Sequence, residues 1–180
     1  MAIPSNLPKN APTPWILWVA LLMAQITMAA VGFVVRRDSS GDFSSEGISL
    51  ILPLGLVASL AGLASLFINF VLIQPEKMRD WARESREKGE NFDRAQGALL
   101  QRYYPRMVVA CALAESVTIF GFVLFFLRQI SPTYFFAFVG VGLALHLFCY
   151  PKLSQVREAL DSEYPPGARN SGRDPAMVRS

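Results

Sequence analysis

Four long apolar runs, separated by short polar segments, dominate the pattern of hydrophobic and polar positions along the chain. Residues 10–35, 47–75 and 129–151 carry no charge, and residues 107–127 carry only one, Glu115. A hydrocarbon core about 30 Å thick is crossed by roughly 20 apolar residues of helix. Because lipid offers no hydrogen bonds to the backbone, each run must satisfy its own polar groups as a helix. The pattern therefore predicts four transmembrane helices.

We expect an all-α integral membrane protein, a four-transmembrane-helix bundle with a cytoplasmic helical loop. The predicted segments are a flexible arm at 1–13, transmembrane helices at 14–35, 48–73, 107–127 and 131–150, an outer loop at 36–47, a cytoplasmic helical hairpin at 74–106, an outer turn at 128–130, and a short helix with a disordered tail at 151–180. The first apolar run is longer than the roughly 7–15 residues of a signal peptide's apolar region, which favours an uncleaved helix. Small residues at Ala29 and Ala30 leave cleavage open.

The distribution of lysine and arginine predicts the orientation. The N-terminal arm, the 74–106 loop and the C-terminal tail carry all the Lys and Arg residues except Arg36, Arg37 and Arg128. Cytoplasmic segments of membrane proteins are enriched in these two residue types. We therefore expect both termini and the long loop in the cytoplasm, with the protein integral to the plasma (inner) membrane.

The 74–106 loop is the longest polar segment between two apolar runs. Opposite charges recur there at helical spacing, as in Arg83 with Glu87, and its eight basic and six acidic residues nearly cancel. This pattern predicts a solvated helical hairpin, broken near Gly89. Phe92 and Leu99 fall on one helical face with Ala95, which leaves open a contact with a partner or the membrane surface.

Composition narrows the classes of function. Charged residues make up 17% of the chain, against about a quarter in soluble domains. The net charge of +3 suits anionic lipid head groups and gives no case for nucleic acid. The sequence has no phosphate-binding glycine loop, no H-E-x-x-H and no C-x-x-C, and its single histidine is His146. We expect no enzymatic activity, no cofactor and no metal site. Cys111 and Cys149 are predicted to be buried thiols without a disulfide.

Glu115 is the candidate functional residue. It lies nine residues past Arg106, which at ~1.5 Å per residue puts it about 13 Å deep, close to the middle of the membrane. An intramembrane carboxylate is costly and faces protein or water rather than lipid. By the same arithmetic Gln25 on the first helix and Ser65 on the second lie near the same depth. We interpret Glu115, Gln25 and Ser65 as candidate ion-binding residues.

Two explanations of this polar layer remain open. Either a protonated Glu115 forms an interhelical hydrogen bond with Gln25 or a serine, or Glu115 carries a proton or a cation. A second polar layer, Asn69 and His146, is expected about 6 Å inside the cytoplasmic boundary. There a histidine with satisfied hydrogen bonds is favoured over a proton relay.

Small residues on the second apolar run predict close helix packing. Ala58 and Gly62 are four residues apart, and Gly55 lies one heptad before Gly62 on the same face. Small residues at this spacing allow helix backbones to approach closely in lipid. We therefore predict that Gly55, Ala58 and Gly62 are helix-packing residues.

The stretch ALAESVTIFGFVLFFL, residues 112–127, resembles the carboxylate-bearing helix of the proteolipid (c) subunit of rotary ATP synthases. That helix reads A-L-x-E-A-x-x-I-Y-G-L-V, and Ala112, Leu113, Glu115, Ile119, Gly121 and Val123 match it in order. The resemblance implies that Glu115 is an ion-binding carboxylate. It covers 16 residues, and the 33-residue loop at 74–106 replaces the family's short connection.

The sequence leaves two hypotheses for function. In the first, the protein is a proteolipid-like membrane protein whose Glu115 binds a proton or cation, within a homo-oligomer or a complex with other membrane protein subunits. In the second, it is a non-catalytic scaffold or accessory subunit that holds a partner with its cytoplasmic hairpin and tail. The lipid bilayer is a partner in both.

Overall fold

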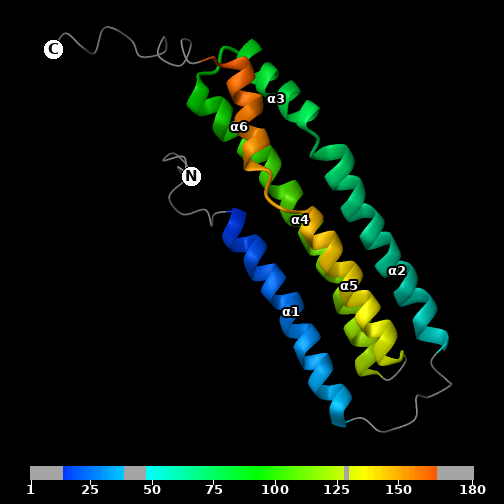
Figure 1. The fold of residues 1–180 in the computed structure, drawn as a ribbon. Helices are drawn as coiled ribbons and strands as arrows, with labels where there is room; N and C mark the ends of the chain where they lie inside the picture. The colour runs from blue at the N-terminus through cyan, green and yellow to red at the C-terminus, as the bar shows by residue number, and fades with distance from the viewer. Residues whose placement is uncertain (1–13, 39–47, 128–129, 166–180) are drawn as a thin grey trace, which may run out of the picture. The chain divides into compact units, whose positions relative to one another are not determined.

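The computed structural model describes residues 14–38, 48–127 and 130–165. Over these residues the chain is helical and has no strand, so the predicted all-α class is confirmed. The helices are α1 (Pro14–Asp38), α2 (Ile48–Phe67), a π-helix η2 (Ile68–Leu72), α3 (Pro75–Glu87), α4 (Phe92–Phe126), α5 (Pro132–Phe148) and α6 (Leu153–Glu163), as Figure 1 shows. The predicted arm at 1–13, most of the outer loop (39–47), two residues of the outer turn (128–129) and the tail from 166 onward lie outside the described residues.

Four helical stretches are long and apolar enough to cross a membrane. They are Pro14–Val35, Leu50–Leu72, Phe92–Phe126 and Pro132–Glu163, the last of which takes in both α5 and α6. The helix that carries Glu115 begins at Phe92, fifteen residues before the apolar run at 107–127, and continues through Pro105. The last charged residue before the apolar run, Arg106, set the predicted start of the helix at 107. The backbone hydrogen bonds of the helix extend further, back to Phe92.

The chain divides into two compact units. The first contains α3, α6 and residues 92–105 of α4, and the second contains α1, α2, α5 and residues 106–126 of α4.

In the first unit, α3 and α6 pack side by side (Figure 1). Gly89, with a φ of 71°, allows the chain to turn between α3 and α4, where the sequence predicts a break. Arg79 on α3 pairs with Glu158 on α6 at 3.0 Å. The backbone N–H of Lys152 donates to the Tyr103 hydroxyl at 2.8 Å. The buried apolar side chains of this unit include Met78, Ala82, Ala95, Leu99, Tyr103, Val156, Ala159 and Leu160.

In the second unit, α5 packs against both α1 and α2. The buried positions of α4 recur every three or four residues, which forms a stripe along one side of the helix. This stripe consists of Met107, Ala110, Cys111, Ala114, Val117, Thr118, Gly121, Leu124 and Phe125.

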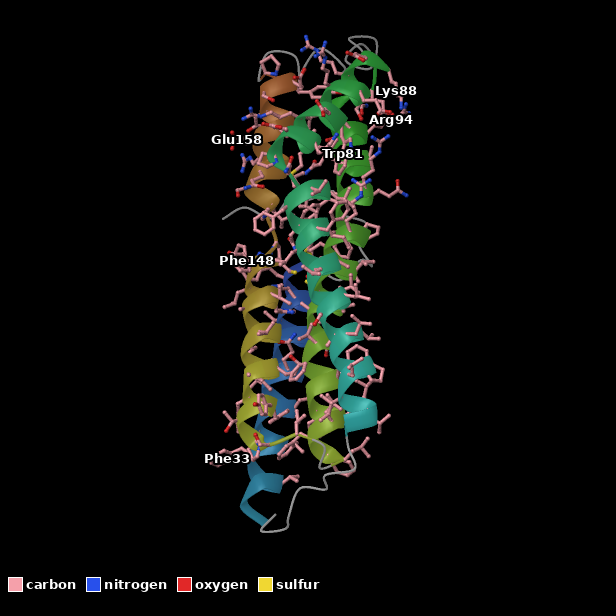
Figure 2. The ribbon with its side chains drawn as sticks, turned by 90° about the vertical axis from the view of Figure 1, so that its right-hand side faces the viewer. Phe33, Trp81, Lys88, Arg94, Phe148 and Glu158 are labelled. Atoms are coloured by element: carbon pink, nitrogen blue, oxygen red, sulfur yellow. The ribbon has the colours of Figure 1, made fainter. Side chains whose placement is uncertain are left out.

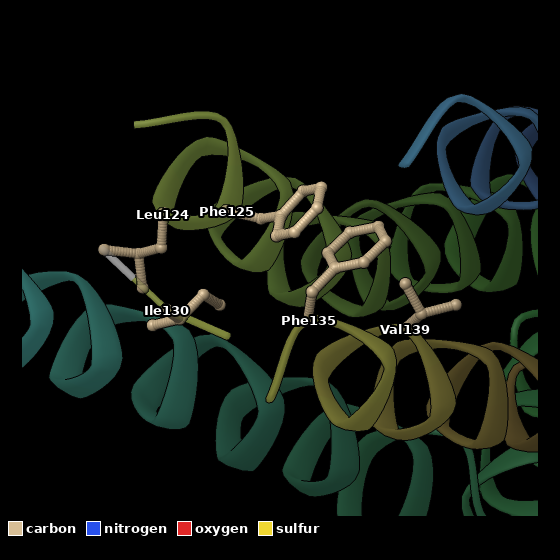
Figure 3. Close-up of a cluster of buried hydrophobic side chains, with 5 residues drawn as sticks. All are labelled: Leu124, Phe125, Ile130, Phe135 and Val139. Atoms are coloured by element: carbon tan, nitrogen blue, oxygen red, sulfur yellow. The ribbon is translucent and has the colours of Figure 1, made fainter. Parts of the chain in front are cut away.

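A cluster of aromatic and aliphatic side chains closes one end of the second unit. The rings of Phe125 on α4 and Phe135 on α5 are stacked with centroids 4.8 Å apart, as Figure 3 shows. Leu124, Ile130 and Val139 complete the buried cluster.

The outward sides of these helices are apolar. Figure 2 shows Phe33 and Phe148 pointing away from their helices, and they are 62% and 54% exposed. Leu52 and Leu63 on α2 are similarly exposed, at 72% and 63%. Charged side chains such as Lys88, Arg94 and Glu158 belong to the first unit (Figure 2). The two units therefore differ in the polarity of their surfaces.

Candidate functional site

Glu115 lies at the border between the buried and the exposed side of α4. Cys111 and Thr118, four residues before it and three after it, are 1% and 0% exposed, whereas Ile119 is 38% exposed. The Glu115 side chain itself is half-buried. Within the described part of the chain its carboxyl forms no hydrogen bond and no ion pair.

Gln25 on α1 is the most unusual polar group of the second unit. Its side chain is 0% exposed, and neither the amide oxygen nor the amide nitrogen has a hydrogen-bond partner among the described residues. The Thr118 hydroxyl on α4 is in the same condition, in a side chain that is also 0% exposed. An amide or hydroxyl buried without a partner costs roughly 2–7 kcal/mol in apolar surroundings. These groups are of the kind that bound water, an ion or a nearby carboxyl satisfies.

Contacts between α1 and α5 fix the height of Gln25. Trp18 on α1 hydrogen-bonds His146 on α5, and a Cβ on Gly32 would overlap the ring of Phe135. The two helices therefore run antiparallel. Gln25 lies seven residues from both Trp18 and Gly32, so it lies opposite the middle of α5, near 140–141.

Contacts between α4 and α5 fix the height of Glu115. A Cβ on Gly142 would overlap the Thr118 hydroxyl and would lie 3.2 Å from the Ala114 carbonyl oxygen. Glu115 follows Ala114 directly, so it lies about level with Gly142. The one or two residues between 140–141 and Gly142 correspond to about 2 Å along a helix. Gln25, Thr118 and Glu115 therefore lie at about the same height, and we name them the mid-bundle layer.

Ser65 does not belong to the mid-bundle layer. Its hydroxyl donates to the Ala110 carbonyl oxygen at 2.9 Å, and Ala110 lies five residues before Glu115 on α4, or about 7.5 Å along the helix. The predicted depth of Ser65 came from counting back from the end of the apolar run. In the structure, packing of α2 against α4 sets its height, and the π-helical residues Ile68–Leu72 lie within the counted segment.

Ser65 instead joins a network around two thiols, consisting of Ser65, Asn69, Cys111 and Cys149, which we name the thiol network. Asn69 Nδ2 donates to Cys149 Sγ at 3.0 Å and to the Ser65 carbonyl oxygen at 3.2 Å. Ser65 Oγ lies 3.7 Å from Cys149 Sγ. Both cysteines are 1% exposed and no disulfide joins them. Their burial could be predicted from the sequence, but their convergence could not, because 38 residues separate them.

The hydrogen bonds of His146 are satisfied in part: Nε2 bonds to α1, whereas Nδ1 has no partner among the described residues. Its Nε2 lies 3.1 Å from the Trp18 carbonyl oxygen, and Trp18 Nε1 donates to the His146 carbonyl oxygen at 3.2 Å. The ring of Trp18 also contacts the rings of Trp15 and Tyr150 edge-on, at 5.6 Å and 5.7 Å. His146 thus connects α1 and α5, whereas Asn69 bonds to Cys149. The two residues of the second predicted polar layer therefore have different partners.

Two of the three predicted helix-packing residues on α2, Ala58 and Gly62, face neighbouring helices, and Gly55 does not. Ala58 is 2% exposed, and a Cβ on Gly62 would lie 3.4 Å from Leu145 and 3.7 Å from Val117. A Cβ on Gly55 would meet nothing within 4 Å. The closest helix approaches occur at Gly32, Gly121 and Gly142, where an added Cβ would overlap a neighbouring side chain. The sequence pattern missed these positions because no second small residue at four-residue spacing marks them.

The first unit contains an exposed charge cluster around Glu84. Arg102 on α4 pairs with Glu84 on α3, and Lys88 pairs with the same carboxylate. The hydrogen bond from Arg102, followed by that from Lys88, lowers the pKa of Glu84 from 4.5 to about 2. These bonds join α3 to α4 across the turn at Gly89.

The described residues contain no group of three or more His, Cys, Asp and Glu side chains that could hold a metal ion. A comparison of the chain with protein-family models, with curated protein sequences and with solved structures gives no match. The resemblance of residues 112–127 to the proteolipid helix therefore stays a prediction.

Proposed function

We propose that this chain is an integral membrane protein whose Glu115 binds and releases a proton or cation within the membrane. The four long apolar helices and their exposed apolar side chains support the membrane location. Exposed apolar surface of this extent is unfavourable in water and favourable in lipid. We place both termini and the first unit in the cytoplasm, because these segments carry most of the Lys and Arg residues.

The observation that carries the proposal is the pair of unpartnered amide atoms of Gln25 at the height of Glu115. We propose that the Glu115 side chain turns toward α1 and meets this amide, which donates through nitrogen and accepts through oxygen. A protonated carboxyl then donates to the amide oxygen, and an ionised one accepts from the amide nitrogen. The same layer thus accommodates both forms of Glu115, which a site that exchanges a proton requires.

A partner subunit completes the proposal. Glu115 lies at the edge of the exposed side of α4, beside Ile119. An intramembrane carboxylate is not left facing lipid. We propose that a second copy of this chain or another membrane subunit covers this edge, in the manner that the resemblance to the ring-forming proteolipid implies.

Labelling with a hydrophobic carbodiimide tests the proposal. Such reagents attack protonated carboxyls in apolar surroundings, and Glu115 is the only acidic residue in the four apolar runs. Mass spectrometry of the full chain in nanodiscs should find one adduct on Glu115, formed more slowly as the pH rises and the carboxyl ionises. Glu115→Gln should remove the adduct and retain the helical circular dichroism. The proposal fails if the reagent leaves Glu115 unmodified at every pH while a water-soluble carbodiimide still modifies the exposed acids.

A scaffold function is the alternative, and the internal bonding of the first unit favours it. Arg79–Glu158, Arg86–Glu163 and Arg102–Glu84 tie its three helical segments together with charges that remain exposed. Such a unit can present a fixed surface to a partner. A scaffold should tolerate Glu115→Gln without loss of cellular function, whereas a proton or cation carrier should not.

A further inference from the structure

The thiol network offers a second site, independent of Glu115. Cys111 comes from the buried stripe of α4, and Cys149 caps the C-terminal end of α5. Cys111 Sγ donates to the Cys149 carbonyl oxygen at 3.9 Å, so the two buried residues are in contact. Two sulfur atoms from different helices thus share one enclosed environment.

An amide donor and a hydroxyl oxygen lie beside one of these sulfur atoms. The Asn69 amide nitrogen is 3.0 Å from Cys149 Sγ, and the Ser65 hydroxyl is 3.7 Å from it. Asn69 is 5% exposed and Ser65 is 1% exposed, so water does not compete for these bonds. A thiol is a weak acceptor, whereas a thiolate accepts hydrogen bonds strongly. The Asn69 N–H would therefore stabilise a thiolate at Cys149.

Asn69 lies where the helix changes from α-helical to π-helical. It lies in the π-helical segment Ile68–Leu72, and its side chain also donates to the carbonyl oxygen of Ser65, four residues earlier. Single π-helical turns within α-helices are rare and occur frequently at functional sites. This segment places Asn69 beside the sulfur atom that Ser65, on α2, also approaches.

We propose that Cys111 and Cys149 form a two-thiolate site for a soft monovalent cation, Cu(I). Thiolates select Cu(I) over harder cations. A structural zinc ion takes four ligands, and the described residues offer no third His, Cys, Asp or Glu beside the pair. Cu(I), in contrast, is stable between two thiolates in a linear arrangement.

The binding step releases protons. Each thiol loses its proton, two S–Cu bonds form, and no electron is transferred. The complex carries one negative charge, which the Asn69 amide donor stabilises. The site lies about one helical turn from the mid-bundle layer, since four residues, or about 6 Å, separate Cys111 from Glu115.

A Cu(I) titration of the full chain in nanodiscs tests the site. The protein is kept anaerobic and reduced, and Cu(I) is delivered in competition with a chromophoric Cu(I) chelator. We expect one Cu(I) per chain, a thiolate-to-copper charge-transfer band in the ultraviolet, release of two protons per ion, and a sulfur shell of two atoms in X-ray absorption. Cys111→Ser and Cys149→Ser should each abolish stoichiometric binding, and Asn69→Ala should weaken it by roughly 10–100-fold, as loss of a ligand-supporting hydrogen bond does.

Ser59→Ala is the matched control, because the Ser59 hydroxyl donates only within its own helix, to the Gly55 carbonyl oxygen. This variant should bind Cu(I) as the parent chain does. Glu115→Gln should also bind normally, which separates this site from the proposed proton or cation site. Two results would overturn the proposal: absence of Cu(I) binding by the parent chain, or binding that persists when either cysteine is replaced in a variant that retains its helical circular dichroism.

Discussion

Trp18 and His146, 128 residues apart, hold each other by two hydrogen bonds in opposite directions. The indole Nε1 of Trp18 donates to the His146 carbonyl oxygen at 3.2 Å, and the imidazole Nε2 of His146 donates to the Trp18 carbonyl oxygen at 3.1 Å. Each residue thereby satisfies a backbone carbonyl of the other helix. This pair fixes the register of α1 against α5, and with it the height of Gln25.

Trp18→Phe should loosen α1 from α5. The substitution removes the Nε1 donor and keeps an aromatic ring, so we expect a loss of about 1 kcal/mol in the free energy of unfolding. Thermal unfolding in detergent measures it. Trp15→Phe is the matched control, because the described contacts of Trp15 are ring contacts with Trp18 and Tyr150. Equal losses in the two variants would show that the hydrogen bond contributes nothing.

Close packing of α4 against α5 should make Gly121 intolerant of a methyl group. A Cβ at Gly121 would overlap Phe138 Cβ, whereas a Cβ at Gly140 would meet nothing within 4 Å. Gly121→Ala should therefore destabilise the chain by roughly 1–3 kcal/mol. Gly140→Ala should leave it unchanged or slightly stabilised, since alanine is the better helix former. Thermal unfolding of both variants in the same detergent measures the difference. Equal melting temperatures would contradict the prediction.

Substitution of leucine for Gly62 or Gly55 on α2 distinguishes packing inside one chain from packing between chains. Gly62→Leu must displace Leu145 and Val117, so it should lower the melting temperature. Gly55→Leu faces open space within the chain, so it should leave the melting temperature unchanged. If a second copy packs on the Gly55 side, Gly55→Leu should instead lower the oligomer mass in mild detergent. An unchanged mass and an unchanged melting temperature in both variants would remove α2 from any close interface.

The Glu84 cluster should give the first unit an acid-sensitive contact. The pKa of Glu84 lies at about 2 in the folded chain against 4.5 ordinarily, so the ionised carboxylate stabilises the folded state above pH 4.5. That contribution should fall as the pH drops from 4.5 toward 2. Carbon-13 NMR of the Glu84 carboxyl should show a midpoint near 2, and Glu84→Gln should remove this part of the acid dependence. Glu158→Gln, which breaks the pair with Arg79, is the control and should retain it.

The proposed orientation rests on the Lys and Arg distribution and can be tested by labelling. Single cysteines introduced as Ser44→Cys and Asp80→Cys, with Cys111 and Cys149 replaced by serine, should react from opposite sides of the membrane. An impermeant thiol reagent should label the Ser44→Cys variant in intact cells and the Asp80→Cys variant only after lysis. Labelling of the Asp80→Cys variant in intact cells would reverse the orientation.

The long helices could be predicted from the sequence because the charges are so unevenly spaced. The continuity of α4 from Phe92 into the apolar run could not, since the charged residues before Arg106 indicated a separate segment. Those residues are as compatible with helix as the apolar ones after them. The helix also continues through Pro105, at the cost of one missing backbone N–H.

The heights of polar groups along the helices could be predicted by counting residues for Gln25 and Glu115 but not for Ser65. Counting residues from the membrane boundary puts Gln25 level with Glu115, and the contacts of α5 with α1 and α4 give the same level. The same counting misplaces Ser65, whose height depends on tertiary packing against Ala110. Thr118 was not a candidate, because a hydroxyl in an apolar run is ordinarily satisfied by its own helix, as Ser116 is by the Ala112 carbonyl oxygen.

The central claim is that Glu115 exchanges a proton in the mid-bundle layer, and infrared spectroscopy can detect that proton directly. A protonated carboxyl absorbs at higher frequency than the amide band, and its frequency falls when it donates a hydrogen bond. Difference spectra of the full chain in nanodiscs across a pH titration should show one such band that Glu115→Gln abolishes. Gln25→Leu should shift it to higher frequency, because the amide acceptor is lost. A titrating band that is indifferent to Gln25→Leu, or the absence of any band that depends on Glu115, would contradict the account.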